Sequence, residues 1–488
     1  MKKLNLNNRR LKYGSFATVM TVVFIAIVII INMIMTALTE RFPLNIDLTS
    51  ENIYQISDEC KDYLQDLEKD VTITILANEG DFSGYGTYYD QAERMIKSFV
   101  QNSSKITLEY VDIVQNPSYV NNYPDLSLNV NDILITSEYR TRQLDINDLF
   151  YVSTDQSGNI SSVSSKAEKV ITSALLAVSS ADIPKVVFLT GHGEADPSLL
   201  KSLLENNGYE TADCAITTEE IPEDAEMVVM FVPTYDLDEE SLKKLDAFLN
   251  NDNQLGKNLL YFGYGGQGEL PNLNAFLAEW GITVEEGMVF ETNSSNIYNM
   301  IPYMATAEYV NTELAASLVE NNIRLLLPYG KGMRVAFEAS GNKSTEVLAQ
   351  YSETAGIVPV VDGEIDTSYI SEDNASGPVP AIVLSTQRTY DGTVPLESKV
   401  VAVSAGAAFA DSSIMENTSF GNADYILSII NNVNAQDQSI SIVSKSMDTT
   451  VLTLSTSQQR TLGLIFVILV PIAVLVCGIV VWLRKRHK

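Results

Sequence analysis

The segment Lys185-Val-Val-Phe-Leu-Thr190 is a nearly continuous apolar run, and it is followed directly by Gly191-His-Gly-Glu194. A short apolar run without alternation is typical of a strand that is buried on both faces of a parallel sheet. A helix is predicted next, because Asp196 and Pro197 are favoured at helix starts and leucines recur at helical spacing until Gly208. The order of strand, glycine-rich turn and helix predicts an α/β fold.

The same alternation continues toward the C-terminus. Further strands are predicted at 227–232, 258–263, 333–337, 381–385 and 399–404, and further helices at 273–280 and 422–433. Another helix is predicted in the leucine-rich segment that begins with Asp236 and Glu239, which have the spacing of a capping box. The acidic segment 351–380, rich in Gly, Pro and Ser, is interpreted as a surface insertion. Successive strand–helix units require right-handed crossovers. Residues 159–435 are therefore predicted to form the larger domain, with a mostly parallel sheet.

A smaller α/β domain is predicted over residues 39–158. Its expected elements are strands at 71–76, 106–113 and 132–136 and a helix at 89–100. This order suggests a thioredoxin-like topology, although the chain has no Cys-x-x-Cys motif and redox chemistry is excluded. The polar stretch 154–165 has the composition of a loop between the two domains.

Composition limits the possible functions. The 488 residues include 32 Lys and Arg against 62 Asp and Glu, a net charge of −30, and no interior segment supplies the basic patch that a nucleic-acid partner requires. Three cysteines without a Cys/His cluster predict neither a disulfide framework nor a metal site. No stretch matches a calcium-binding loop, so the acidic excess is interpreted as a solvated surface.

Two apolar runs, at 16–38 and 462–483, are predicted to cross a membrane. The first has 23 residues, and at about 1.5 Å per residue this gives about 34 Å of helix, enough for a hydrocarbon core of about 30 Å. A cleaved signal peptide is the alternative for this run, but its apolar region is longer than such peptides need, and no convincing cleavage site follows.

Basic residues flank both runs and fix the expected orientation. They are Lys2, Lys3, Arg9, Arg10 and Lys12 before the first run, and Arg484, Lys485, Arg486 and Lys488 after the second. The positive-inside bias then keeps the tails 1–15 and 484–488 in the cytoplasm and places everything between the runs outside the cell membrane. The Ser/Thr-rich segment 436–461 is predicted to be a stalk.

The segment Gly191–Glu194 is the densest group of residues that could carry chemistry. His192 is the only histidine outside the terminal tails, and Glu194 could orient it or accept hydrogen bonds from backbone N–H groups. Two interpretations stay open, a structural turn or non-catalytic contact site and a catalytic His/Glu pair. The chain offers no Gly-x-Ser-x-Gly elbow and no cysteine after a strand, so acyl transfer would lack a nucleophile.

A second glycine-rich motif, Gly263-Tyr-Gly-Gly-Gln-Gly268, matches the dinucleotide-binding pattern Gly-x-Gly-x-x-Gly. It follows the third strand of its domain, Pro271 comes soon after, and the segment is expected outside the membrane, away from the cofactor pool. A structural turn is the preferred interpretation, and no cofactor is predicted.

In these motifs the chain resembles the GldG-like family, auxiliary components of ABC-type transport systems that are named for gliding motility. The resemblance rests on four groups of residues in chain order. The first is Asn45-Ile-Asp-Leu-Thr49 with Tyr54, Ser57 and Val71-Thr-Ile-Thr74, and the second is Glu168-Lys-Val-Ile-Thr172 with Val187-Phe-Leu-Thr-Gly-His-Gly-Glu194. The third is Val232-Pro-Thr-Tyr-Asp-Leu-Asp238, and the fourth is Ala408-Phe-Ala-Asp411 with Gly421-Asn422-Ala-Asp424. It covers nearly the full chain, membrane runs included. The chain departs from the family pattern at Asn251–Gly256, where a Gly-Gly turn is expected.

The resemblance implies a non-enzymatic, two-pass auxiliary subunit that works beside an ATP-binding subunit and an ABC-2-type permease. It also implies an α/β core similar to class I glutamine amidotransferases without their catalytic cysteine. Gliding itself is not implied. The candidate contacts to a ligand, substrate or envelope component are Gly191, His192, Gly193, Glu194, Gly421 and Asn422. Two alternatives remain, an envelope hydrolase that uses His192 and Glu194, and a free-standing envelope sensor or scaffold.

Overall fold

The computed structural model describes residues 22–23, 25–27, 29–30, 33, 55–154, 160–181, 183–361, 364–434 and 445–446. The chain divides into the units Met1–Asn52 and Ile53–Lys488, and the elements below belong to the second. The apolar run 462–483 and most of 16–38 lie outside the described residues. Among the helices that are described, none is long and apolar enough to span a bilayer.

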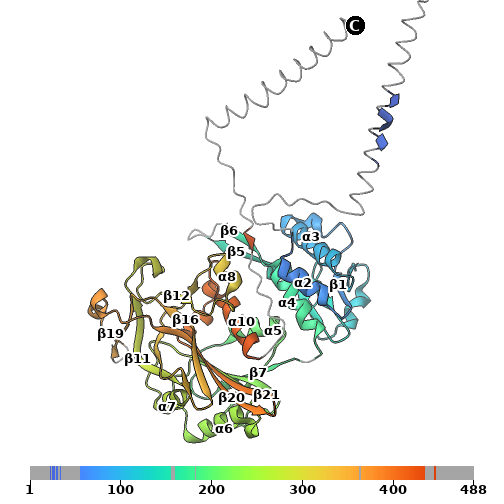
Figure 1. The fold of residues 1–488 in the computed structure, drawn as a ribbon. Helices are drawn as coiled ribbons and strands as arrows, with labels where there is room; N and C mark the ends of the chain where they lie inside the picture. Colours follow the sequence, from blue (N-terminus) through green and yellow to red (C-terminus); the bar gives the residue numbers. More distant parts are fainter. Residues whose placement is uncertain are drawn as a thin grey trace, which may run out of the picture. The chain divides into compact units, whose positions relative to one another are not determined.

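The N-terminal part of this unit carries the labels β1, α2, α3 and α4 in Figure 1. It is built on a four-stranded sheet with the order β2-β1-β3-β4. The strands are β1 (Val71–Ile75), β2 (Ile106–Tyr110), β3 (Ile133–Thr136) and β4 (Thr141–Leu144). β1 is parallel to β2 and antiparallel to β3, and β3 is antiparallel to β4. The strands predicted at 71–76, 106–113 and 132–136 are therefore confirmed, with small differences at their ends.

Three helices share the core of this sheet. They are α2 (Asp58–Asp66), α3 (Thr87–Asn102) and α4 (Ala167–Ser179), with short 3-10 turns at Ser83–Tyr85, Pro117–Asn122 and Ile146–Leu149. Each helix contributes buried apolar side chains, such as Leu64, Phe99 and Leu175, to one hydrophobic cluster with the strands. The core of the small domain thus includes α4, which begins after the boundary predicted at residue 158.

A hairpin replaces part of the loop that was expected at 154–165. β5 (Phe150–Thr154) pairs antiparallel with β6 (Ile160–Ser165), so the prediction of a loop is wrong for the second strand. The serine-rich composition of β6 does not predict a strand, because pairing with β5 rather than local propensity stabilises it. A third strand, β22 (Lys445–Ser446), pairs with β6, and it lies within the segment predicted to be a stalk.

The larger sheet has the order β13-β12-β16-β20-β21-β10-β9-β7-β8, with β15 beside β16. The parallel strands are β7 (Lys185–Thr190), β8 (Glu210–Ala215), β9 (Ala225–Phe231), β10 (Asn258–Phe262) and β21 (Val394–Val403). The antiparallel strands are β12 (Thr306–Tyr309), β13 (Leu325–Leu326), β15 (Ala339–Ser340), β16 (Lys343–Tyr351) and β20 (Pro380–Asp391).

The prediction of a mostly parallel sheet is therefore wrong for one half of it. Asp391 is paired with Val394, so Gly392 and Thr393 alone connect β20 to β21. A two-residue connection allows only an antiparallel pair, since a parallel pair needs a long crossover. The positive φ of 63° at Gly392 is the conformation that such tight turns require.

Smaller sheets occupy much of the segment interpreted as a surface insertion. β17 (Ala355–Val358) joins β11 (Ile282–Glu291) and β14 (Lys331–Val335), and β18 (Val360–Val361) pairs with β19 (Glu364–Ile365). The other helices of the larger domain are α5 (Ser198–Asn206), α6 (Glu239–Asn250), α7 (Pro271–Glu279), α8 (Ala316–Glu320), α9 (Ser412–Met415) and α10 (Asn422–Val433). Short 3-10 turns lie at Asn251–Asn253, Ser294–Asn296, Thr367–Tyr369, Glu372–Asn374 and Gly406–Phe409.

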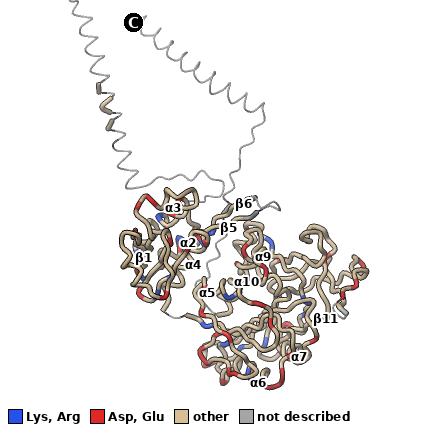
Figure 2. The backbone as a smooth tube through the Cα atoms, turned by 180° about the vertical axis from the view of Figure 1, so that it is seen from behind, with Lys and Arg blue, Asp and Glu red and all other residues tan. Residues whose placement is uncertain are grey.

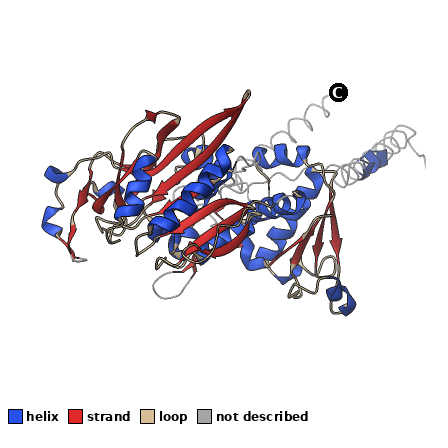
Figure 3. Cartoon of the chain, turned by 90° about the horizontal axis from the view of Figure 1, so that it is seen from below, coloured by secondary structure: helices blue, strands red, loops and turns tan. Residues whose placement is uncertain are grey.

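Helices cover both faces of the parallel half of the sheet (Figure 3). Along β7, Val186 and Phe188 belong to a core shared with α5 and α10, whereas Val187 and Leu189 belong to a second core with α6 and α7. Alternate residues of a strand point to opposite faces, so an unbroken apolar run fills both cores. The acidic residues are spread over helices and loops, including α3, α6 and α7, as expected of a solvated surface (Figure 2).

The start of α6 differs from the predicted capping box. Asp238, not Asp236, is the N-cap, and its carboxylate accepts a hydrogen bond from Ser241 N at 2.7 Å. The Asp236 carboxylate instead accepts from Asn272 N (2.8 Å) and Leu273 N (3.1 Å) at the start of α7. Asp236 therefore connects the loop after β9 to the start of α7. Local sequence does not indicate this long-range contact.

Candidate functional site

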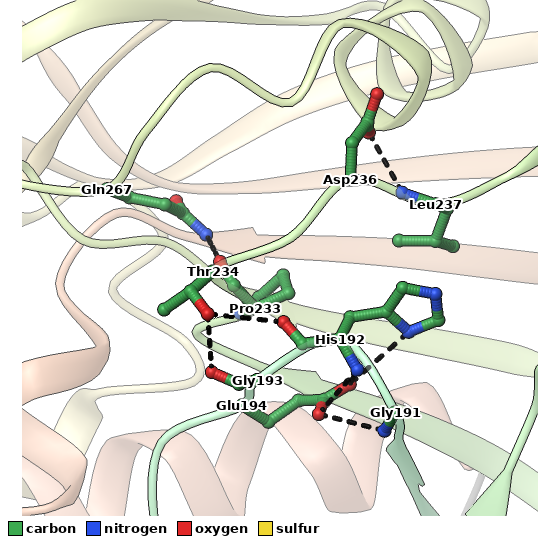
Figure 4. Close-up of polar contacts among 9 residues, drawn as sticks. All are labelled: Gly191, His192, Gly193, Glu194, Pro233, Thr234, Asp236, Leu237 and Gln267. Carbon is green, nitrogen blue, oxygen red and sulfur yellow. Dashed lines mark hydrogen bonds and ion pairs between the residues drawn. The ribbon is translucent and has the colours of Figure 1, made fainter.

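The candidate site is formed by loops at the carboxyl ends of β7, β9 and β10, which lie side by side because the three strands are parallel neighbours (Figure 4). The Gly191–Glu194 loop follows β7. Its His192 carbonyl accepts hydrogen bonds from Thr234 N and Tyr235 N, both at 2.8 Å, in the loop after β9. Thr234 Oγ1 also donates to the Gly193 carbonyl at 2.9 Å. The edge of the sheet is the usual place for ligands in α/β folds, but here the loops bind each other.

Glu194 closes the loop on itself. Its carboxylate accepts hydrogen bonds from Gly191 N at 3.1 Å and from His192 N at 3.0 and 3.1 Å. Carboxylate bonds of this kind are among the stronger ones because the acceptor is ionised. The sequence allowed this role for Glu194, and the structure assigns its carboxylate to the turn.

The His192 side chain is turned into the protein and is only 3% exposed. Its Nδ1 lies 3.5 Å from Glu194 Oε1 and makes no hydrogen bond within the described residues. A general base must come within hydrogen-bond reach of a substrate proton, directly or through one water. The groups of this loop that face solvent are instead the exposed backbones of Gly191 and Gly193.

Both glycines are required by backbone geometry. Gly191 has φ 114° and Gly193 has φ 68°, in the region that favours glycine. A Cβ on Gly193 would overlap Thr234 Oγ1 and lie 2.9 Å from carbons of the Tyr235 ring. The spacing Gly-His-Gly is thus explained by the tight turn and by close packing against the loop after β9.

The ionisation of Glu194 contributes to the stability of this loop. Burial acts to raise the pKa of Glu194, but His192 and the backbone N–H groups outweigh burial, and the pKa is lowered. A carboxylate with a lowered pKa stabilises the fold above its unfolded pKa of about 4.3, and this stability is lost as the pH falls through the folded pKa.

We therefore expect Glu194→Gln to lower the thermal unfolding midpoint of the full-length chain at pH 7, with the difference shrinking as the pH falls below about 4.3. Unfolding midpoints of both proteins from pH 3 to 7 would test this. The exposed Glu313→Gln, at a position outside the helices and strands, is the matched control. A difference that stays constant over this range would contradict the role assigned to the Glu194 carboxylate.

The glycine-rich segment Gly263–Gly268 is filled by the chain itself. The amide of Gln267, which is 8% exposed, accepts a hydrogen bond from Tyr261 Oη at 3.0 Å and donates to the Pro233 carbonyl. The buried Lys331 ammonium donates to the Gln267 carbonyl at 2.9 Å, and burial lowers the pKa of Lys331. A Cβ on Gly265 would lie 2.6 Å from Met288 Cγ. These glycines make room for side chains, which agrees with the structural interpretation of the motif.

Gly421 and Asn422 lie apart from this loop cluster in the hydrogen-bond network. Asn422 is fully buried, accepts from Leu326 N at 3.1 Å and donates to the Leu326 carbonyl at 2.7 Å. Gly421 N donates to the Arg324 carbonyl at 2.8 Å. No hydrogen bond between described residues joins this pair to Gly191–Glu194. Asn422 thus binds β13, the strand at one edge of the large sheet.

Sequence reasoning missed the partners of the Gly191–Glu194 loop. Thr234, Gln267 and Lys331 were not selected as candidates, because the network depends on which loops the sheet brings together. Thr234 does lie in the segment 232–238 that carries part of the family resemblance. Over the described residues, no group of three or more His, Cys, Asp or Glu side chains is arranged to hold a metal ion.

Comparisons with known proteins give a family match to part of the chain and distant structural likenesses, of which two are described here. Residues 50–151 match a domain of unknown function, DUF7088, which covers most of the small domain. The solved "mmIFT52 N-terminal domain" is similar over 52% of this chain and 100% of its own, at 14% identity and a TM-score of 0.39. The "Structure of PurLQS from Thermotoga maritima" is similar over 52% and 100%, at 16% identity and a TM-score of 0.29. No curated protein sequence matches the chain.

Proposed function

We propose that this protein is a non-enzymatic, membrane-anchored auxiliary subunit of an ABC-2-type transport system, of the GldG-like kind. The observation that carries the proposal is the presence of an apolar run with basic flanks at each end of one chain, around a large acidic α/β segment. In this proposal, as the family resemblance implies, ATP hydrolysis and the transport path belong to separate subunits, an ATP-binding protein and a permease.

The described topology supports the finer fold assignment in this proposal. The order β2-β1-β3-β4, with β1 and β2 parallel and β3 and β4 antiparallel, is compatible with a thioredoxin-like small domain. The parallel strands β8-β7-β9-β10-β21 with helices on both faces are compatible with an amidotransferase-like core. The cysteine that such enzymes use has no counterpart after β7, β9 or β10.

The geometry of the Gly191–Glu194 loop supports a non-enzymatic role. The imidazole of His192 is buried, and the Glu194 carboxylate is engaged by backbone N–H groups. A catalytic pair would present at least one of these groups to a substrate. We propose that the loop offers its exposed glycine backbone as a contact for a substrate or an envelope component.

Purification of the tagged full-length chain from native membranes in a mild detergent tests the proposal. We expect mass spectrometry to find an ATP-binding subunit and a multi-helix permease in constant ratio to the chain, and the complex to hydrolyse ATP. A different two-pass membrane protein with the same tag is the control. Recovery of the chain alone from several mild detergents would overturn the assignment to a transport system.

The predicted orientation has its own test. Met300 is 93% exposed in the large domain, so we expect a Met300→Cys variant to react with a membrane-impermeant maleimide on intact cells or spheroplasts. The unsubstituted chain is the control, because Cys60 and Cys214 are buried and any reaction of Cys477, in the run 462–483, is measured in it directly. Labelling of Met300→Cys only after lysis would place the domain on the cytoplasmic side and contradict the orientation.

A further inference from the structure

A cavity of about 470 Å³ lies between one face of α4 and one face of α5, and residues of the segments 142–152 and 415–424 complete its lining. Lys166 and Lys169 line it at the start of α4, and Ser202 and Asn206 line it from α5. The lining residues of each helix recur three or four positions apart, so each helix presents a single face to the cavity. The volume is within the range of about 300–1,000 Å³ that is typical of small-molecule sites.

Three cationic side chains line this cavity in a chain whose net charge is −30: Arg142, Lys166 and Lys169. Lys169 is neutralised by an ion pair with Asp424, and both side chains are largely buried. Arg142 donates to the Glu205 carbonyl, an uncharged acceptor. Neither Arg142 nor Lys166 has an ion pair with any residue that the structure describes.

The two unpaired cations are poorly solvated. Burial, and then the like charge of Lys169, lowers the pKa of Lys166, against the opposing effect of Glu416 and Asp148. Burial, and then Arg140, lowers the pKa of Arg142. Asp148 and Glu416 also line the cavity, but both are exposed, so water screens their charges. The cavity thus has two half-buried cations with N–H donors that are available to a ligand.

We propose that the cavity between α4 and α5 binds a small polyanion, with one carboxylate or phosphate group held by Arg142 and another by Lys166. The guanidinium of Arg142 can donate two parallel hydrogen bonds to one oxyanion, and the ammonium of Lys166 offers a point charge to the other. Hydroxyl and amide groups of Ser202 and Asn206 are available to the uncharged part of the ligand. The site shares no residue with the Gly191–Glu194 loop, and the inference does not depend on the transport proposal.

Binding to the purified full-length chain in detergent tests the inference, with citrate as the carboxylate probe and pyrophosphate as the phosphate probe. We expect saturable binding of at least one probe by calorimetry at constant ionic strength, and at least about tenfold weaker binding to Lys166→Met and Arg142→Gln. The matched control is Lys105→Met, which removes an exposed lysine paired with Asp70 and should leave binding unchanged. Lys166→Arg should retain most of it.

The preferred probe identifies the oxyanion. Absence of saturable binding of either probe to the unsubstituted chain would overturn the proposal, and so would equal binding by Lys166→Met, Arg142→Gln and Lys105→Met. Neither outcome bears on the subunits that copurify with the chain, so failure here is distinguishable from failure of the proposed function.

A second measurement needs no substitution. Lys166 should be acetylated by acetic anhydride several-fold more slowly when the chain is saturated with the bound probe, while Lys105 reacts at an unchanged rate. Equal acetylation of Lys166 with and without the probe would contradict binding at this cavity, even if the chain binds anions elsewhere.

Discussion

Replacing Gly193 with alanine should open the Gly191–Glu194 loop and destabilise it by about 2–5 kcal/mol. The positive φ of 68° costs an alanine about 1–2 kcal/mol. The added Cβ would also overlap Thr234 Oγ1 and crowd the Tyr235 ring, and overpacking of this kind typically costs a further ~1–3 kcal/mol. Relief of the overlap requires the two loops to separate, so the hydrogen bonds to the His192 carbonyl should weaken as well.

A matched control separates these two effects. Gly392 has nearly the same φ, 63°, but a Cβ there meets no atom within 4 Å, so Gly392→Ala should incur the conformational cost alone. Hydrogen–deuterium exchange of peptides that cover residues 190–196 and 232–237, together with the thermal midpoint, gives the comparison. If Gly193→Ala and Gly392→Ala lower the midpoint equally, close packing of Gly193 is not what requires the glycine.

Asn422→Ala is expected to release β13 from the edge of the large sheet. The Asn422 amide bonds both the N–H and the C=O of Leu326 in a fully buried position, at 3.1 and 2.7 Å. Its loss leaves two buried backbone groups without partners, each at a cost of about 1–3 kcal/mol. We expect a total of about 2–6 kcal/mol and faster amide exchange at Leu325–Leu326.

Asn432→Ala is the control for this substitution. Asn432 lies on the same helix, α10, but its side chain is exposed and makes no hydrogen bond to the described residues. It should change the thermal midpoint little. Unchanged exchange at Leu325–Leu326 in Asn422→Ala would show that the amide of Asn422 does not hold this strand.

Strongly periodic segments were predictable from the sequence. Residues 422–433 were predicted to be a helix and form α10, and the run 185–190 forms β7 between two cores. In both segments the pattern of apolar residues itself encodes burial on particular faces, so local sequence is sufficient.

Elements that depend on distant partners were not predictable in this way. The serine-rich β6 is a strand only because β5 pairs with it, and its composition indicates a loop. The antiparallel half of the large sheet was also missed, although glycine at the first position of a two-residue turn, here Gly392-Thr393, is a recognised hairpin signal between two β-prone runs.

The candidate site shows the same division between local and distant information. Its position at the end of β7 followed from the apolar run and the glycines that come after it. The inward orientation of His192 and the bonds from Thr234 depend on the order of β7, β9 and β10 in the sheet, which the sequence does not specify locally. The cavity with Lys166 requires α4 and α5 to be brought together, so no motif marks it.

The pairing of β22 with β6 has a mechanical consequence. If both ends of the chain are held in a membrane as proposed, tension between them enters the folded unit near α2 and leaves it through β22. Both elements belong to the small domain or its hairpin, so the load path bypasses the large sheet. The small domain would then carry the tensile force between the two ends. The large domain would carry none of it and could move without stretching the chain.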